Sequence, residues 1–85
     1  MKAILIYTSY FNGDTPSSVA HVFSSIERAK EELLEQIAYD EKNGAVLVWI
    51  SDDERRAMYK VLGRNSKRVL YNVVLTVYPA EEIYD

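Results

Sequence analysis

The chain contains no cysteine, three glycines, two prolines and a single histidine among its 85 residues. The absence of cysteine excludes disulfides, thiolate metal sites and cysteine nucleophiles, and it favours a reducing, cytoplasmic setting. One histidine is too few for the imidazole clusters that hold a catalytic zinc or a non-haem iron. No apolar run approaches the about 18 residues of a membrane span, and the N-terminal run is typical of a strand rather than of a signal peptide.

The composition is otherwise that of an ordinary soluble domain, with 48% hydrophobic and 27% charged residues and a net charge of −3. A chain of this length cannot divide its apolar residues between two cores. We therefore expect one compact domain over residues 1–79, followed by a short acidic tail over residues 80–85.

Two segments carry the signature of a helix start, Ser-Ser-Ile-Glu at residues 24–27 and Ser-Asp-Asp-Glu at residues 51–54. In such a signature the serine caps the third helical N–H and the glutamate reaches back to the serine N–H. The first predicts an amphipathic helix over residues 25–42 that stops at Asn43 and Gly44. The second predicts a helix over residues 52–62 that Gly63 ends.

Three segments rich in branched and aromatic residues predict strands, at residues 2–11, 45–50 and 68–78. The uninterrupted apolar run at 45–50 indicates a central strand that is parallel to a neighbour. Residues 19–23 fit either a strand or the start of a longer helix, and the strand is favoured because a cap at Ser24 would be wasted inside a helix. The predicted fold class is α+β, in the order β-(β)-α-β-α-β, with a three- to four-stranded mixed sheet and two amphipathic helices.

No arrangement of residues predicts a catalytic or a metal site. His21 lies on an alternating segment and is expected to be structural, although it could meet Asp14 across the preceding turn. The acidic groups at 52–54 and 40–41 are explained as the first turn of one helix and the solvated end of another, where Asp40 and Glu41 oppose the helix dipole. The polar loop at 9–18 offers a weaker possibility, a small anionic ligand bound after the first strand.

Charge is unevenly distributed along the chain. The segment from 55 to 68 holds six of the ten cations, and no acid occurs from Arg55 to Ala80, whereas the first predicted helix is acidic. A basic segment of this kind could meet nucleic acid or an acidic protein surface, or it could simply complement the end of the second helix. The candidate phosphate or acidic-partner residues are Arg55, Arg56, Lys60, Arg64, Lys67 and Arg68.

Seven tyrosines are many for this length, and tyrosine is enriched at protein interfaces. The candidate interface residues are Tyr10, Phe11, Tyr39, Tyr78 and Tyr84. The sequence therefore favours a non-enzymatic module that binds a partner protein, or a second copy of itself, as a regulator or inhibitor. Small accessory proteins of phages and mobile elements are often of this kind. A nucleic-acid-binding protein is the next interpretation, and an enzyme is the least favoured.

Overall fold

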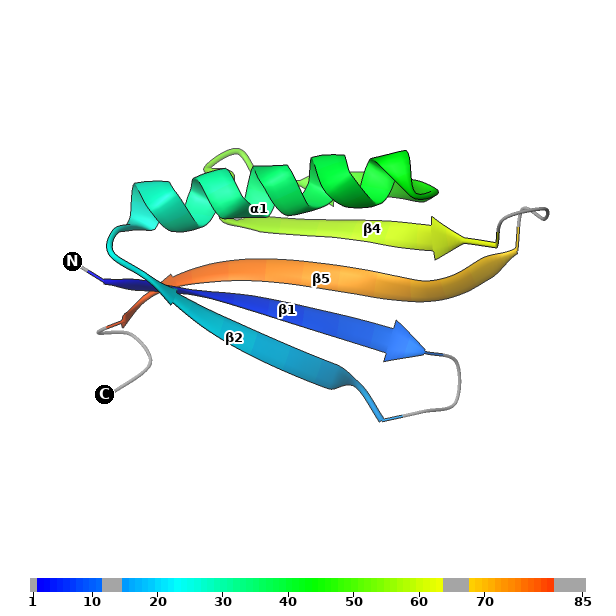
Figure 1. Ribbon diagram of the computed structural model, residues 1–85, viewed down its shortest axis with the longest axis horizontal. Coiled ribbons are helices and arrows are strands. Elements are labelled where there is room, and N and C mark those ends of the chain that lie inside the picture. Colours follow the sequence, from blue (N-terminus) through cyan, green and yellow to red (C-terminus); the bar gives the residue numbers. More distant parts are fainter. Residues whose placement is uncertain (1, 12–14, 64–67, 81–85) are drawn as a thin grey trace.

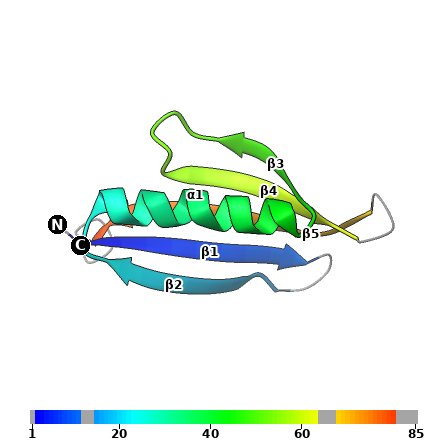
Figure 2. The same ribbon diagram turned by 45° about the horizontal axis from the view of Figure 1, so that its top comes forward.

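The computed structural model describes residues 2–11, 15–63 and 68–80. The elements along the chain are β1 (Ala3–Phe11), β2 (Ser17–Phe23), α1 (Ile26–Lys42), β3 (Ala45–Ile50), β4 (Arg56–Leu62) and β5 (Val69–Pro79). The five strands form one sheet in the order β2-β1-β5-β4-β3, and every neighbouring pair is antiparallel. Helix α1 lies along one face of this sheet (Figures 1 and 2).

The core lies between α1 and the sheet. The helix buries Ala29, Leu33 and Ile37, which are spaced four residues apart and so share one side of the helix. The sheet contributes alternate residues of β1, β4 and β5, among them Leu5 and Leu75. Because side chains alternate along a strand, the residues between these point to the opposite face, which no helix of the described chain covers. We call that second surface the open face.

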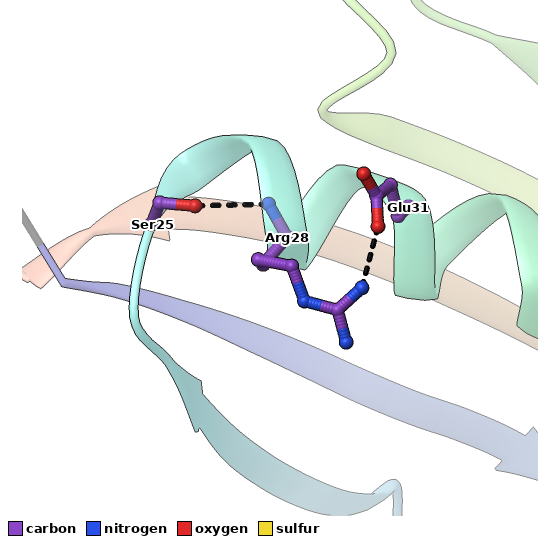
Figure 3. A network of polar contacts seen from close by, with 3 residues as sticks. All are labelled: Ser25, Arg28 and Glu31. Carbon is purple, nitrogen blue, oxygen red and sulfur yellow. Dashed lines mark hydrogen bonds and ion pairs between the residues drawn. The ribbon is translucent and has the colours of Figure 1, made fainter.

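The first half of the chain follows the prediction. The ambiguous residues 19–23 lie in β2, which pairs with β1 to form the expected hairpin. Helix α1 is also confirmed, but its N-cap is Ser25 rather than Ser24. The Ser25 hydroxyl accepts a hydrogen bond from the Arg28 N–H at 3.1 Å, and Arg28 in turn pairs with Glu31 (Figure 3). At the other end Gly44, with a φ of +103°, directs the chain into β3.

The predicted sheet and the second helix are wrong. The sheet has five strands and is entirely antiparallel, and residues 56–62 form β4 instead of a helix. Residues 57, 58, 61 and 62 fit a helical stripe, but that stripe omits Tyr59, which is completely buried. The buried set is the alternating one that includes Ala57 and Tyr59, while Arg56, Met58 and Lys60 face away from α1.

The misread helix start is a tight turn between β3 and β4. The Ser51 hydroxyl accepts hydrogen bonds from the N–H groups of Arg55 (3.2 Å) and Arg56 (3.0 Å), and it donates to Asp53 Oδ1 at 2.7 Å. That last bond, together with one from the Arg55 N–H, lowers the pKa of Asp53. Serine and aspartate cap helices and close turns by the same side-chain-to-backbone bonds, so their presence does not decide between the two.

The turn also stores backbone strain that a substitution should relieve. Among the described non-glycine residues, Glu54 has a positive φ, of 57°. We expect Glu54→Gly to raise the free energy of unfolding by about 0.5–1 kcal/mol, because a left-handed conformation costs a side-chain-bearing residue more than the added freedom of glycine in the unfolded chain. Urea unfolding measures this, with Asp52→Gly in the same turn as a control that should not stabilise. Equal gains from both substitutions would contradict the explanation.

Strand β3 is not the central parallel strand that its apolar run indicated. Within the described residues it pairs with β4 alone, antiparallel, and forms one edge of the sheet. The prediction assumed that a strand apolar on both faces is buried on both faces. In this fold neither face of β3 is fully covered, and its four central apolar side chains therefore remain exposed, although Ala45 is buried.

Candidate functional site

The edge strand β3 exposes a continuous apolar segment. Its four central residues are 37% to 50% exposed, and the first and last residues of the strand are also apolar. We call this segment the β3 edge; it consists of Val46, Leu47, Val48 and Trp49. No charge and no proline interrupts it. A bulge between Leu47 and Trp49 shifts the register against β4 and places Leu47 on the side of α1 and Trp49 on the open face.

The β3 edge continues onto the open face of β4. Trp49 lies opposite Met58, and Val46 lies opposite Lys60. Arg56 shares this face with Lys60, because the two are four residues apart on the same strand. The continuous surface therefore has an apolar centre and two cations beside it.

The opposite edge of the sheet is different. Among the described strands β2 also has one unpaired side, but its sequence is Ser-Ser-Val-Ala-His-Val-Phe, which begins with two serines and has a histidine before its last two apolar residues. Val19 and Val22 are exposed there, but His21 lies between them and Phe23 is half-buried, so β2 has no run of four exposed apolar residues. The two edges thus differ in chemistry although both present free backbone groups.

A groove of about 410 Å³ runs between α1 and β2. It exists because α1 covers the middle of the sheet and leaves the α1-facing side of β2 exposed. Its lining is mainly apolar, with three polar side chains besides the Tyr7 hydroxyl. The lining residues are Leu5, Tyr7, Val19, His21, Phe23, Glu32, Gln36 and Leu75.

A part-buried polar network lies beside this groove. The Tyr59 hydroxyl donates to the Asp40 carboxylate, and the same carboxylate oxygen accepts a bond from Gln36 Nε2 at 3.2 Å. Burial and the hydrogen bond to Asp40 raise the pKa of Tyr59 strongly. Burial also raises the pKa of Tyr7, and a hydrogen bond with Tyr59 partly offsets that rise. Asp40, which opposed the helix dipole without explanation in the sequence, therefore links α1 to β4.

The interface candidates from the sequence do not share one surface. Tyr10 and Phe11 are exposed at the end of β1, but consecutive strand residues point to opposite faces. Phe11 packs against Tyr71, with ring centroids 4.7 Å apart. Tyr10 lies on the open face, opposite Asn72 of β5.

The remaining tyrosine candidates are also dispersed. Tyr39 is 66% exposed on α1, the layer that covers the other side of the sheet. Tyr78 is half-buried on β5 and lies opposite Ile4 on the open face. Tyr84 lies outside the described residues.

The basic candidates converge only in part. Arg56 and Lys60 share the open face, whereas Arg55 lies in the turn before β4 and Arg68 lies directly before β5. Arg64 and Lys67 fall outside the described residues. The segment is therefore a strand with two cations on one face, not the basic end of a helix.

The other sequence candidates form no site of their own. In the 9–18 loop, residues 12–14 lie outside the described residues, and Ser17 and Ser18 belong to β2, where the Ser18 hydroxyl hydrogen-bonds that of Thr8 at 2.9 Å. No helix therefore begins at Ser17 and Ser18, and the argument for an anion bound at a helix N-terminus does not apply there. His21 is exposed on β2. Within residues 2–11, 15–63 and 68–80, no three acidic or histidine side chains are grouped to hold a metal, and no helix is long and apolar enough to cross a membrane.

Sequence reasoning missed the two most informative surfaces, the β3 edge and the groove. The β3 edge had a signal, the charge-free run of residues 45–50, but the run was assigned to the interior. The groove had no signal in the sequence, because its existence depends on how far α1 extends across the sheet.

Comparison with models of known protein families, with curated proteins and with solved structures finds no match for this chain. Its function must therefore be inferred from its own surfaces.

Proposed function

We propose that this chain is a non-enzymatic module that binds a partner protein through the β3 edge and so regulates or inhibits that partner. The observation that carries the proposal is the exposure of four consecutive apolar residues, Val46 to Trp49, on a strand with one unpaired side. The absence of cysteine makes the cytoplasm the expected location of the complex.

The physical argument concerns unprotected edge strands. Proteins usually protect such edges with charged residues, prolines or a covering element, since unpaired backbone groups beside apolar side chains promote association. Strand β2 has Ser17, Ser18 and His21 along its edge, whereas β3 has no polar residue and is interrupted only by its bulge. An edge of this kind suits a partner that adds a strand: backbone hydrogen bonds supply affinity and the exposed side chains supply specificity.

The charges beside the β3 edge specify the partner further. Arg56 and Lys60 are the cations next to the apolar centre. Most described acids of the chain lie on α1, on the other side of the sheet, while Asp53 of the turn at 51–54 lines a hollow with Arg56. A partner strand that is apolar and carries carboxylates on one side would complement both features. A strand of that chemistry is the occupant we propose.

The decisive experiment is affinity capture of the tagged full chain from its source cells, after nuclease treatment, with two matched variants. Val48→Lys places a charge on the β3 edge, and Val22→Lys places the same charge on an exposed valine of the opposite edge. We expect the wild type and Val22→Lys to retain one stoichiometric protein, and Val48→Lys to lose it by about tenfold or more. Circular dichroism confirms that both variants fold.

Three results would overturn this proposal. Retention of the same protein by Val48→Lys would exclude the β3 edge as the binding surface. Loss of all captured proteins on nuclease treatment would point to nucleic acid. Sedimentation of the purified wild type as a dimer and of Val48→Lys as a monomer would make a second copy of the chain the occupant.

Nucleic acid is the second candidate, favoured by one observation. Arg56 and Lys60 share the open face with the aromatic residues Tyr10, Trp49 and Tyr78, the combination that single strands require. The aliphatic residues of the same face, and the presence of just two cations on the part of it that β4 forms, weigh against nucleic acid. Binding of a labelled oligonucleotide that falls steeply with salt would support this candidate.

A further inference from the structure

We infer that the groove between α1 and β2 is a binding site for a small cationic amphiphile, an ammonium group attached to an apolar body. The inference does not rest on the proposed function, since the groove adjoins β2 and the β3 edge is at the other side of the sheet. Either site could be occupied without the other.

The dimensions and the apolar lining favour a small molecule. A volume of about 410 Å³ falls within the range of about 300–1,000 Å³ typical of ligand sites. Leu5 and Leu75 are buried in the core and form the floor of the groove, while the exposed Val19 and the half-buried Phe23 of β2 form its side. Val19 and Phe23 therefore offer apolar contact to the body of a ligand.

The polar side chains specify the charge of the ligand. Glu32 is the acid of the lining, and none of the described lining residues is a lysine or an arginine. Gln36 uses its amide N–H to bond Asp40, which leaves its carbonyl oxygen to accept a bond from a ligand. A carboxylate and a carbonyl together favour a cationic donor.

The bond from Gln36 to Asp40 also organises the site. Asp40 is held by the Tyr59 hydroxyl of β4, so the Gln36 amide is connected to the core through two hydrogen bonds. A side chain fixed in this way loses less conformational freedom when a ligand binds. The groove therefore combines an apolar lining, a negative charge and a positioned acceptor.

Nuclear magnetic resonance titration of the full chain with three probes of one shape tests the inference. The probes are 4-phenylbutylamine, 4-phenylbutanol and 4-phenylbutyrate, at about pH 8, where a primary amine remains protonated. We expect saturable binding of the amine, with shift changes in the amides of residues 5, 7, 19 and 21. The alcohol should bind more weakly than the amine, and the carboxylate most weakly.

Two variants and a control assign the charge preference. Glu32→Gln should weaken binding of the amine by about fivefold, the effect of one partly exposed ion pair. Val19→Lys, at an exposed lining position, should abolish binding of the amine and strengthen that of the carboxylate. Glu41→Gln is the control: it removes an exposed acid from α1 outside the groove and should change neither the affinity for the amine nor that for the carboxylate.

Several results would overturn the inference. The groove would not be the proposed site if the amine showed no saturable binding or if the three probes bound with equal affinity. The same holds if the shift changes were confined to the β3 edge, or if Glu32→Gln bound the amine as tightly as the wild type does. None of these results bears on the capture experiment with Val48→Lys, so the two proposals can fail separately.

Discussion

Leu33→Ala is expected to lower the free energy of unfolding by about 3–5 kcal/mol, the cost of a large cavity in a core that cannot collapse. Leu33 is 0% exposed and lies in the middle of α1, between Ala29 and Ile37. Since α1 is the layer that covers this face of the sheet, no second helix within the described residues can move to fill the space. A domain of 85 residues has a total stability of about 4–13 kcal/mol, so the variant should lose a large fraction of its stability.

The next residue along the chain supplies the control. Leu34 has the same side chain on the same helix turn but is 40% exposed. Leu34→Ala should cost less than about 1 kcal/mol, because it removes little buried area and alanine favours the helix. Urea unfolding followed by circular dichroism compares the two variants. Similar costs at both positions would mean that α1 does not pack on the sheet through Leu33.

The second large effect is expected at Tyr59, whose hydroxyl joins β4 to α1. Tyr59→Phe should lower the free energy of unfolding by about 1.5–3 kcal/mol, the range for a hydrogen bond to a charged group. The ring remains, so the loss isolates the hydroxyl and leaves the Asp40 carboxylate with its bond from Gln36. Tyr39→Phe is the control, because the Tyr39 side chain is exposed and its loss of a hydroxyl should be nearly neutral.

A double-mutant cycle separates the Tyr59 bond from other effects. If the hydroxyl acts through Asp40, Tyr59→Phe should cost much less in an Asp40→Ala background than in the wild type. Additive costs would show that the two residues act independently. The cycle also tests whether the bond to Tyr59 accounts for an acidic residue near the C-terminal end of α1.

The Tyr59 contribution should depend on pH in a defined direction. Burial and the bond to Asp40 raise its pKa above the ordinary value of 10.0. Its stabilisation is therefore fully present below pH 10 and is lost as the pH rises further, since the phenol of the unfolded chain ionises first. The loss can reach about 1.4 kcal/mol per pH unit. The difference in stability between wild type and Tyr59→Phe should accordingly narrow above pH 10, and a widening difference would contradict the assignment.

The amino-acid sequence by itself determined the first half of the fold. The hairpin of β1 and β2 and the extent of α1 follow from local signals: alternation, a serine cap, a 3.6-residue stripe and Gly44 at the stop. Such signals act within a few residues, so they can be recognised without the tertiary structure. The same reasoning recovered Arg56 and Lys60 as cations but placed them on a helix.

Only the tertiary structure decided the second half and both candidate sites. Ser51 could cap a helix or close a turn, and the choice depended on Tyr59, which is buried only if β4 pairs with β5. The run at 45–50 would suit the centre of a sheet as well as its edge, and its position depends on which strands pair over long sequence distances. The groove likewise exists because one helix covers five strands incompletely. Which strands pair, and how much of the sheet the helix covers, depend on the whole chain, so no local sequence pattern predicts them.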